Sequence, residues 1–186
     1  MIQSHKKNGS DRSLVQKATG FNELLLPKGS EEGKIVPELT PLDDEVVVTK
    51  TTDSAITGTN LRLILRNMGI DTIVVTGVFA DQCVSGTVRA LADESFYVWL
   101  IEDACMAATE EIQNNELEIL NNIYCHVINS EELLDVLNKM SKTHNFTLFA
   151  VTIDEGIPGY RDEALKIVES FCAQLKIQHK VFSYKK

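Results

Sequence analysis

Two residues of this sequence have the side chains and positions that nucleophilic chemistry requires, Cys83 and Lys50. Cys83 follows a strand-like apolar run at 71–75 and precedes a helix-like pattern, so its thiol is expected beside a helix N-terminus. That position lowers the pKa of a thiol and favours the thiolate, and free N–H groups there could bind an oxyanion. Lys50 ends another strand-like run, and its ammonium would keep the thiolate ionised. From position alone, it is equally possible that Lys50 is a solvated residue at a strand end and that Cys83 is only a packing residue.

The other three cysteines, Cys105, Cys125 and Cys172, belong to no metal-binding or redox motif. No two cysteines stand at a CxxC spacing, which argues against a zinc site or a thioredoxin-like centre. Reduced thiols are the default in a chain without a secretory signal, and a cysteine usually behaves as a small buried hydrophobe. We therefore expect no metal ion and no cofactor.

The elements that would position these side chains alternate between strands and helices. Strand-like runs lie at 45–50, 71–75, 96–101 and 124–128, and helix-like patterns lie at 61–68, 84–91, 109–122 and 130–140. The run at 96–101 has no polar alternation, so both of its faces are expected to be buried. This order predicts a three-layer α/β/α fold with a mainly parallel sheet. Ligands bind at the carboxyl ends of such strands, which here are followed by Lys50 and by the turn that carries Cys83.

Local signals mark the ends of the expected helices. Asn60, Thr109 and Ser130 stand where N-caps belong, and Gly69 stands where a glycine commonly follows a helix. Residues 1–33 are expected to be irregular, because Gly, Ser, Asn, Asp and Pro punctuate them.

The overall composition fits a globular protein of about one domain. The chain has 186 residues, a formal net charge of −9 and 44% hydrophobic residues. The acidic balance argues against a protein that coats nucleic acid, and no apolar run approaches the ~18 residues that span a membrane. The start, MIQSHKKNGSDRS, lacks the apolar core of a signal peptide. We therefore expect a cytoplasmic protein.

Residues 1–140 resemble the isochorismatase-like cysteine hydrolase superfamily. The segments that carry the resemblance are GSEEGKIVPELTP (29–41), VVVTKTTDSAITGTNL (46–61), GIDTIVVTGVFADQCVSGTVRALAD (69–93) and VWLIEDACMAAT (98–109). The resemblance implies that Cys83 is the nucleophile and Lys50 the catalytic lysine. It also implies a cis peptide bond between Val78 and Phe79, with the N–H groups of Phe79 and Cys83 directed toward the oxyanion. Asp81 and Thr59 are expected to support the site.

The sequence departs from the pattern of this superfamily in several places. Ile56 stands where the family has an aromatic residue. The family's catalytic aspartate ends its first strand, and this chain is expected to begin near the second strand, without the first. The aspartates at 11, 43, 44 and 53 lie elsewhere in the pattern. The metal ligands of nicotinamidase-type members are also unmatched, and His5, a lone histidine, is expected at the surface.

Residues 141–186 resemble a different family, the PP-loop ATPases that thiolate tRNA. The core of this resemblance is IDEGIPGYRDEAL at 153–165. An incomplete β-α-β segment is expected, with a strand at 146–153, a Gly-Pro-Gly turn, a helix and a last strand at 180–183. The Ser-Gly-Gly-x-Asp-Ser nucleotide loop of that family has no match upstream, so a structural extension is expected rather than a phosphate site.

These expectations favour an amidohydrolase in which the Cys83 thiolate attacks a small amide or ureido carbonyl. The alternative is a non-catalytic pseudoenzyme or interaction protein, because general acid/base assistance of the kind the absent aspartate gives is worth ~10²–10⁴-fold in rate. A third hypothesis is tRNA sulfuration through the C-terminal segment. The expected partners are a small amide-like substrate and further copies of the chain in a homo-oligomer, with neither membrane nor nucleic acid.

Overall fold

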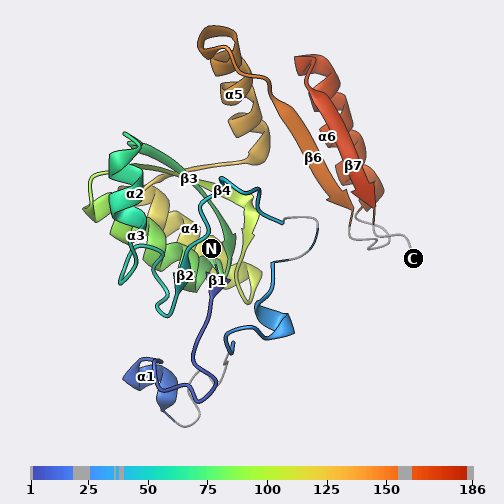
Figure 1. The fold of residues 1–186 in the computed structure, drawn as a ribbon. Coiled ribbons are helices and arrows are strands. Elements are labelled where there is room, and N and C mark those ends of the chain that lie inside the picture. Colours follow the sequence, from blue (N-terminus) through green and yellow to red (C-terminus); the bar gives the residue numbers. More distant parts are fainter. Residues whose placement is uncertain (1, 19–25, 36, 38–39, 155–160, 184–186) are drawn as a thin grey trace. The chain divides into compact units, whose positions relative to one another are not determined.

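The computed structural model describes residues 2–18, 26–35, 37, 40–154 and 161–183. The chain divides into two compact units, Met1–Val127 and Ile128–Lys186, and Figure 1 shows the elements of each. Among the described residues, no helix is both long enough and apolar enough to cross a membrane.

The main sheet of the first unit has the strand order β3-β4-β5, in agreement with the predicted α/β fold. Its strands are β3 (Thr72–Val78), β4 (Tyr97–Met106) and β5 (His126–Ile128). β3 and β4 are parallel, as continuous apolar strands predict. Among the described residues β3 pairs with β4 alone, so its second edge is open.

The pairing of β3 with β4 is interrupted near the carboxyl end of β3. Val75 pairs with Leu100, but Gly77 pairs with Cys105, so β4 contains several extra residues opposite Thr76. The side chain of Gln113 holds this bulge. Its amide nitrogen donates to the carbonyl of Cys105 at 3.1 Å, and its amide oxygen accepts from the N–H of Ala107 at 2.8 Å. The last two residues of β3 therefore form a segment distinct from the regularly paired ladder.

Helices cover the sheet and supply much of the core. They are α2 (Leu61–Asn67), α3 (Ser85–Asp93) and α4 (Glu110–Ile123). α3 and α4 both contact β4 and each other. The buried core comprises Ala80, Val84, Val88, Leu91, Phe96, Val98, Leu100, Cys105, Ala107, Leu117 and Leu120. The sequence predicts that both faces of β4 are buried, and Val98, Leu100 and Ile101 are buried. Tyr97 is 69% exposed, so the prediction was wrong at that position.

A charged network links α3 to α4. Arg89 donates from its guanidinium to Glu116 and to the hydroxyl of Ser85, and Ser85 in turn donates to Glu116. The Arg89 guanidinium also lies over the ring of Tyr124, 4.7 Å from its centroid. The network is partly shielded from water, so we expect it to contribute more to the free energy of unfolding than an exposed ion pair does.

The helix ends largely follow the sequence signals. Thr109 is the N-cap of α4 and accepts from the N–H of Ile112, and Gly69 follows α2 with a φ of +69°, a conformation that glycine adopts without cost. Asn60 is the N-cap of α2 but makes no side-chain capping bond.

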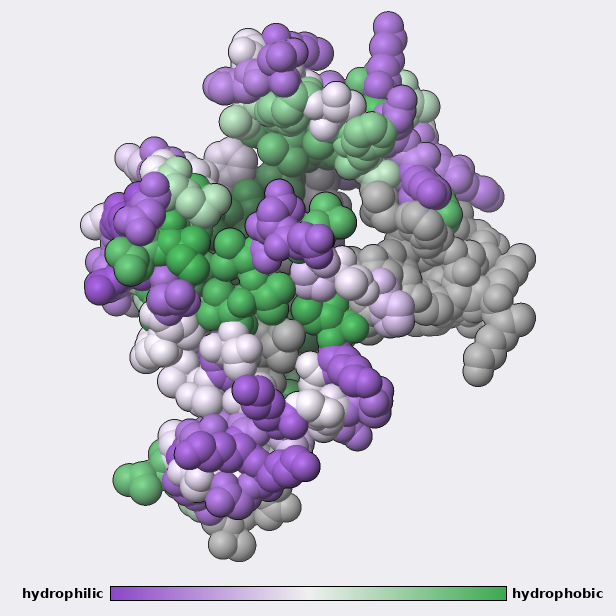
Figure 2. All heavy atoms as spheres, in the orientation of Figure 1, coloured by the Kyte–Doolittle hydropathy of each residue, from purple (hydrophilic) through white to green (hydrophobic). Residues whose placement is uncertain are grey.

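A second, two-stranded sheet consists of β1 (Ile2–Gln3) and β2 (Thr49–Lys50), which are parallel. The strand expected at 45–50 is thus reduced to its last two residues, and Val46 and Val47 are exposed. The reason is that a strand requires a partner, and among the described residues β2 pairs only with Ile2–Gln3. The expected irregular segment also contains a short helix, α1 (Leu14–Lys17), and a 3₁₀ turn at Glu31–Gly33. Figure 2 shows apolar residues gathered over the middle of the first unit, while the segment around α1 is mostly hydrophilic.

The second unit begins with helix α5 (Ser130–His144) and continues with β6 (Phe149–Asp154), α6 (Arg161–Leu175) and β7 (Gln178–Ser183). β6 and β7 are parallel, so the expected strand–helix–strand order is confirmed. The N-cap of α5 is Asn129 rather than Ser130, because the Asn129 side chain accepts from the N–H of Glu132 in a reciprocal capping box. The expected glycine- and proline-containing turn at 156–159 (GIPG) lies outside the described residues.

Candidate active site

Cys83 lies in the turn that joins β3 to α3. The Val78–Phe79 peptide bond, for which the family resemblance implies the cis form, is cis in the structure. The next residues, Ala80–Val84, form a π-helical turn in which the carbonyl of Phe79 accepts from the N–H groups of Gln82 and Val84. Ala80 and Val84 are buried, whereas Cys83 is half-buried. The apolar anchors of the turn therefore leave the thiol at the edge of the core.

Lys50 is placed by the pairing of β2 with β1. Its carbonyl accepts from the N–H of Ser4 at 3.0 Å, and its side chain is turned inward, only 8% exposed. The ammonium donates to the carbonyl of Thr52 at 2.7 Å. A buried ammonium is costly unless polar groups surround it, so its burial requires partners beyond apolar contact.

The loop that follows Lys50 brings a carboxylate to the thiol. Cys83 Sγ donates to Asp53 Oδ1 at 3.7 Å. The hydroxyl of Thr87 fixes the loop, because it accepts from the N–H of Ala55 at 3.0 Å and donates to the carbonyl of Cys83 at 2.6 Å. Sequence reasoning missed Asp53, which it placed outside the family pattern. The available signal was its position three residues after Lys50, on the same rim of the fold.

The thiol of Cys83 is harder to ionise than the sequence suggests. Burial raises its pKa above the ordinary value, the ammonium of Lys50 acts in the opposite direction, and the carboxylate of Asp53 raises the pKa again. The net shift is upward, so the expectation of a lowered pKa was wrong. The reason is that burial of the thiol, the largest cause, together with the Asp53 carboxylate outweighs the opposing effect of Lys50.

A cavity of about 590 Å³ adjoins Cys83 and Lys50. Val78 also lines it, whereas Phe79, Asp81 and Thr59 do not. Its remaining walls are mostly apolar and come from the loop after Lys50 and from α2, β3 and α3: Ala55, Leu61, Leu65, Ile73, Val75 and Leu91. A nucleophile and a cation therefore line the same pocket, whose other walls can contact an apolar group of a ligand.

The supporting residues from the sequence have different surroundings. Thr59 donates to the carbonyl of Ala55 at 2.7 Å and so braces the loop after Lys50. It lines a separate cavity of about 420 Å³ together with Ile56. Asp81 lies in the π-helical turn, and its Oδ1 is buried with no hydrogen-bond partner among the described residues. Within these described residues, no three His, Cys, Asp or Glu side chains are grouped to hold a metal ion.

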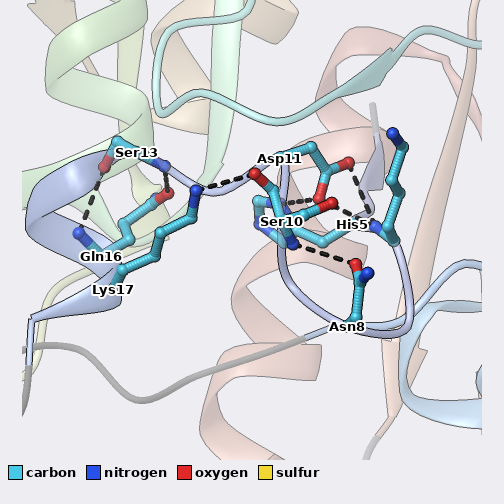
Figure 3. Close-up of polar contacts among 8 residues, drawn as sticks. His5, Asn8, Ser10, Asp11, Ser13, Gln16 and Lys17 are labelled. Atoms are coloured by element: carbon cyan, nitrogen blue, oxygen red, sulfur yellow. Dashed lines mark hydrogen bonds and ion pairs between the residues drawn. The ribbon is translucent and has the colours of Figure 1, made fainter.

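His5 is buried, 3% exposed, so the expectation of a surface histidine was wrong. The backbone N–H of His5 donates to the carbonyl of Leu26, and the backbone carbonyl of His5 accepts from the N–H of Lys28, both at 2.8 Å. Figure 3 shows the imidazole beside Asp11, with Nδ1 3.9 Å from Oδ1. Asp11 also accepts from the N–H of Lys6. His5 therefore ties the N-terminal segment together.

Comparison with known proteins identifies relatives of most of the first unit. Residues 3–132 match the isochorismatase domain. The chain is 33% identical over 135 residues to YrdC, an uncharacterised isochorismatase family protein of Bacillus subtilis, and the match covers 66% of this chain and 70% of that protein.

Solved structures show the same likeness. An isochorismatase-like hydrolase from Alkaliphilus metalliredigens is 28% identical with a TM-score of 0.61, over 72% of this chain and 66% of that one. N-carbamoylsarcosine amidase from Thermoplasma acidophilum is 27% identical with a TM-score of 0.57, over 69% of each chain. Among four curated relatives, the chain spans between 42% and 79% of their length.

Proposed function

The chain belongs to the isochorismatase family, and on this premise we propose that it is a cysteine hydrolase that cleaves a C–N bond in a small amide or ureido compound. The observation that carries the proposal is the placement of Cys83 and Lys50 on one cavity at the carboxyl ends of β2 and β3. The likeness to N-carbamoylsarcosine amidase supports the choice of a C–N bond. A thiol is a suitable nucleophile for that bond, because it forms a thioester that water can hydrolyse.

In the proposed reaction the sulfur of Cys83 attacks the substrate carbonyl carbon. The negative charge on the carbonyl oxygen is stabilised by the N–H groups of Phe79 and Cys83, at the turn after the cis peptide bond. Lys50 stabilises the sulfur as it loses its proton. The C–N bond breaks and ammonia or an amine leaves, and water then hydrolyses the thioester to release the acid and restore Cys83.

The walls of the cavity favour substrates with an apolar acyl or N-substituent group. Leu61, Leu65 and Ile73 line the space beyond Cys83 and Lys50. Removing apolar surface from water stabilises a complex by about 25 cal/mol per Å², so each added methylene is worth ~0.8 kcal/mol until the space is filled. Small aliphatic and aromatic amides are accordingly preferred over amides with a charged acyl group.

Ammonia release by the purified full chain tests this function. The substrates are nicotinamide, an N-carbamoyl amino acid and a series of aliphatic amides of increasing length. We expect turnover that increases along the aliphatic series and disappears in Cys83→Ala, together with a covalent adduct on Cys83 when an electrophilic probe is added. Persistent turnover in Cys83→Ala, or a probe that leaves Cys83 unmodified, would contradict the assignment.

A second candidate is a non-catalytic protein that keeps the fold. The raised pKa of the Cys83 thiol favours it, because a protonated thiol is a weak nucleophile. Turnover at background level for every substrate, from a protein that unfolds cooperatively, would support this alternative. A third candidate, tRNA sulfuration, rests on the β6–α6–β7 motif of the second unit, and ATP binding by the full chain tests it.

The cellular location, the oligomeric state and the extents of the two regions are also part of this proposal. We expect a cytoplasmic homo-oligomer whose ligand is a small molecule and not nucleic acid, with a hydrolase region at 1–140 and an extension at 141–186. Sedimentation at several protein concentrations measures the oligomeric state.

A further inference from the structure

The thiol of Cys83 has a proton acceptor in hydrogen-bond contact. Its Sγ donates to Asp53 Oδ1, and the 3.7 Å separation is within the range of hydrogen bonds that involve sulfur. The two residues are 30 positions apart in sequence, so the contact arises from folding and not from a shared turn. A candidate general base must lie within hydrogen-bond reach of the proton that it abstracts, and Asp53 meets this condition.

The backbone around Asp53 is held against α3 on two sides. Thr87 joins the loop to the Cys83 turn through the N–H of Ala55 and the carbonyl of Cys83. Gly86 has no side chain where the loop passes: a Cβ there would lie 3.7 Å from the nitrogen of Ser54 and 3.8 Å from the Cβ of Asp53. The loop is therefore seated on the helix that carries the nucleophile, and the carboxylate has a defined position.

Internal hydrogen bonds also define the shape of the loop. The hydroxyl of Thr52 shares its one proton between the carbonyls of Ser54 and Thr57, which lie at 3.0 and 2.8 Å. The carbonyl of Thr52 accepts from the ammonium of Lys50. The same short segment thus fixes the cation and presents the carboxylate, so that the thiol has Lys50 and Asp53 as its charged neighbours.

We propose that Asp53 is a proton-transfer residue of this hydrolase, because its carboxylate is in hydrogen-bond contact with the thiol of Cys83. The proposal rests on the C–N hydrolase function given above. Asp53 contacts the reacting sulfur, so its part in the chemistry is direct. The structure places it on the loop after Lys50, where the pattern of the family does not locate a catalytic acid.

The proton then follows a closed path. As the S–C bond forms, the S–H bond breaks and the proton moves to an oxygen of Asp53. When the C–N bond breaks, its electron pair stays on nitrogen, which takes the proton from Asp53 and leaves as ammonia or an amine. In the second half, water adds to the thioester and gives a proton to Asp53, and that proton returns to the sulfur as the C–S bond breaks. One water molecule is consumed, and both side chains are restored.

The test compares Asp53→Asn with wild type in two measurements on the full chain. Asn keeps the shape of the side chain but cannot accept the proton, so we expect kcat/KM for amide hydrolysis to fall by about 10²–10⁴-fold. The carboxylate raises the pKa of the Cys83 thiol, so alkylation of Cys83 by iodoacetamide at neutral pH should become faster in the same variant. A merely structural role of Asp53 would not produce opposite changes in the two rates.

Two further variants serve as controls. Asp44→Asn changes an exposed aspartate before β2 and should leave both rates unchanged. Asp53→Glu keeps a carboxylate and should recover part of the hydrolysis lost in Asp53→Asn. Hydrolysis in Asp53→Asn within about threefold of wild type overturns the role of Asp53 while leaving the proposed function intact. A fall in both hydrolysis and alkylation also overturns it, because Asp53 would then only hold the loop. Absence of hydrolysis in wild type defeats the proposed function and with it this role.

Discussion

Substitutions at Gly86 test how closely the loop after Lys50 lies against α3. A Cβ at this position would meet the nitrogen of Ser54 at 3.7 Å and the Cβ of Asp53 at 3.8 Å, which are ordinary van der Waals distances. Alanine therefore fits without displacing the loop, and it removes the conformational freedom that glycine has in the unfolded chain. We expect Gly86→Ala to raise the free energy of unfolding by about 0.5–1 kcal/mol and to keep the hydrolytic activity.

Gly86→Val should act in the opposite direction. The Cβ already touches the loop, so the added methyl groups must push Ser54 and Asp53 away. Overpacking of this kind costs ~1–3 kcal/mol, and hydrolysis should fall because the carboxylate moves away from Cys83. Urea unfolding followed by circular dichroism measures the stability of each variant, and kcat/KM measures the activity. Destabilisation by alanine, or wild-type activity in the valine variant, would refute the packing of the loop on the helix.

The remaining predictions concern the core, the charged network and pH. Leu120→Ala removes a fully buried side chain and should lower the free energy of unfolding by ~2–5 kcal/mol, whereas Leu63→Ala at an exposed site should change it by less than ~0.5 kcal/mol in urea titrations. Glu116→Gln removes the charge from the partly buried network and should cost ~1.5–3 kcal/mol by the same method, against less than ~1 kcal/mol for Glu94→Gln in an exposed ion pair. Burial raises the pKa of Cys125 from 9.0 to about 11, so the unfolded chain loses this proton first. The contribution of Cys125 to stability should therefore fall as the pH rises from 9 to 11, and thermal unfolding of Cys125→Ala should depend less on pH in that window.

Much of the first unit could be predicted from local sequence patterns. β3, β4 and α4 appear where apolar runs and helical periodicity place them, because their side chains enter one continuous core. Gly69 and Thr109 also act at helix ends as their types suggest. Such signals depend on neighbours within one turn or one strand, which the sequence displays directly.

Features that depend on distant partners could not be predicted in this way. The run at 45–50 has the composition of a strand, yet only Thr49–Lys50 finds a paired neighbour. Asp53 lies outside the family pattern, and its contact with Cys83 depends on Thr87 and on the missing side chain of Gly86. The predicted direction of the Cys83 pKa shift was wrong for the same reason, since the sequence shows neither the burial of the thiol nor the proximity of the carboxylate.

The break in pairing opposite Thr76 has a consequence for how this fold tolerates change. Residues before the break, such as Val75, belong to the regular ladder with β4, while Gly77 and Val78 lead into the turn that carries Cys83. Gln113 holds the extra residues of β4 and so absorbs the mismatch between the two segments. Substitutions at Gly77 and Val78 therefore alter one part of the cavity wall, while the register of Thr72–Val75 with β4 remains set by its own pairs.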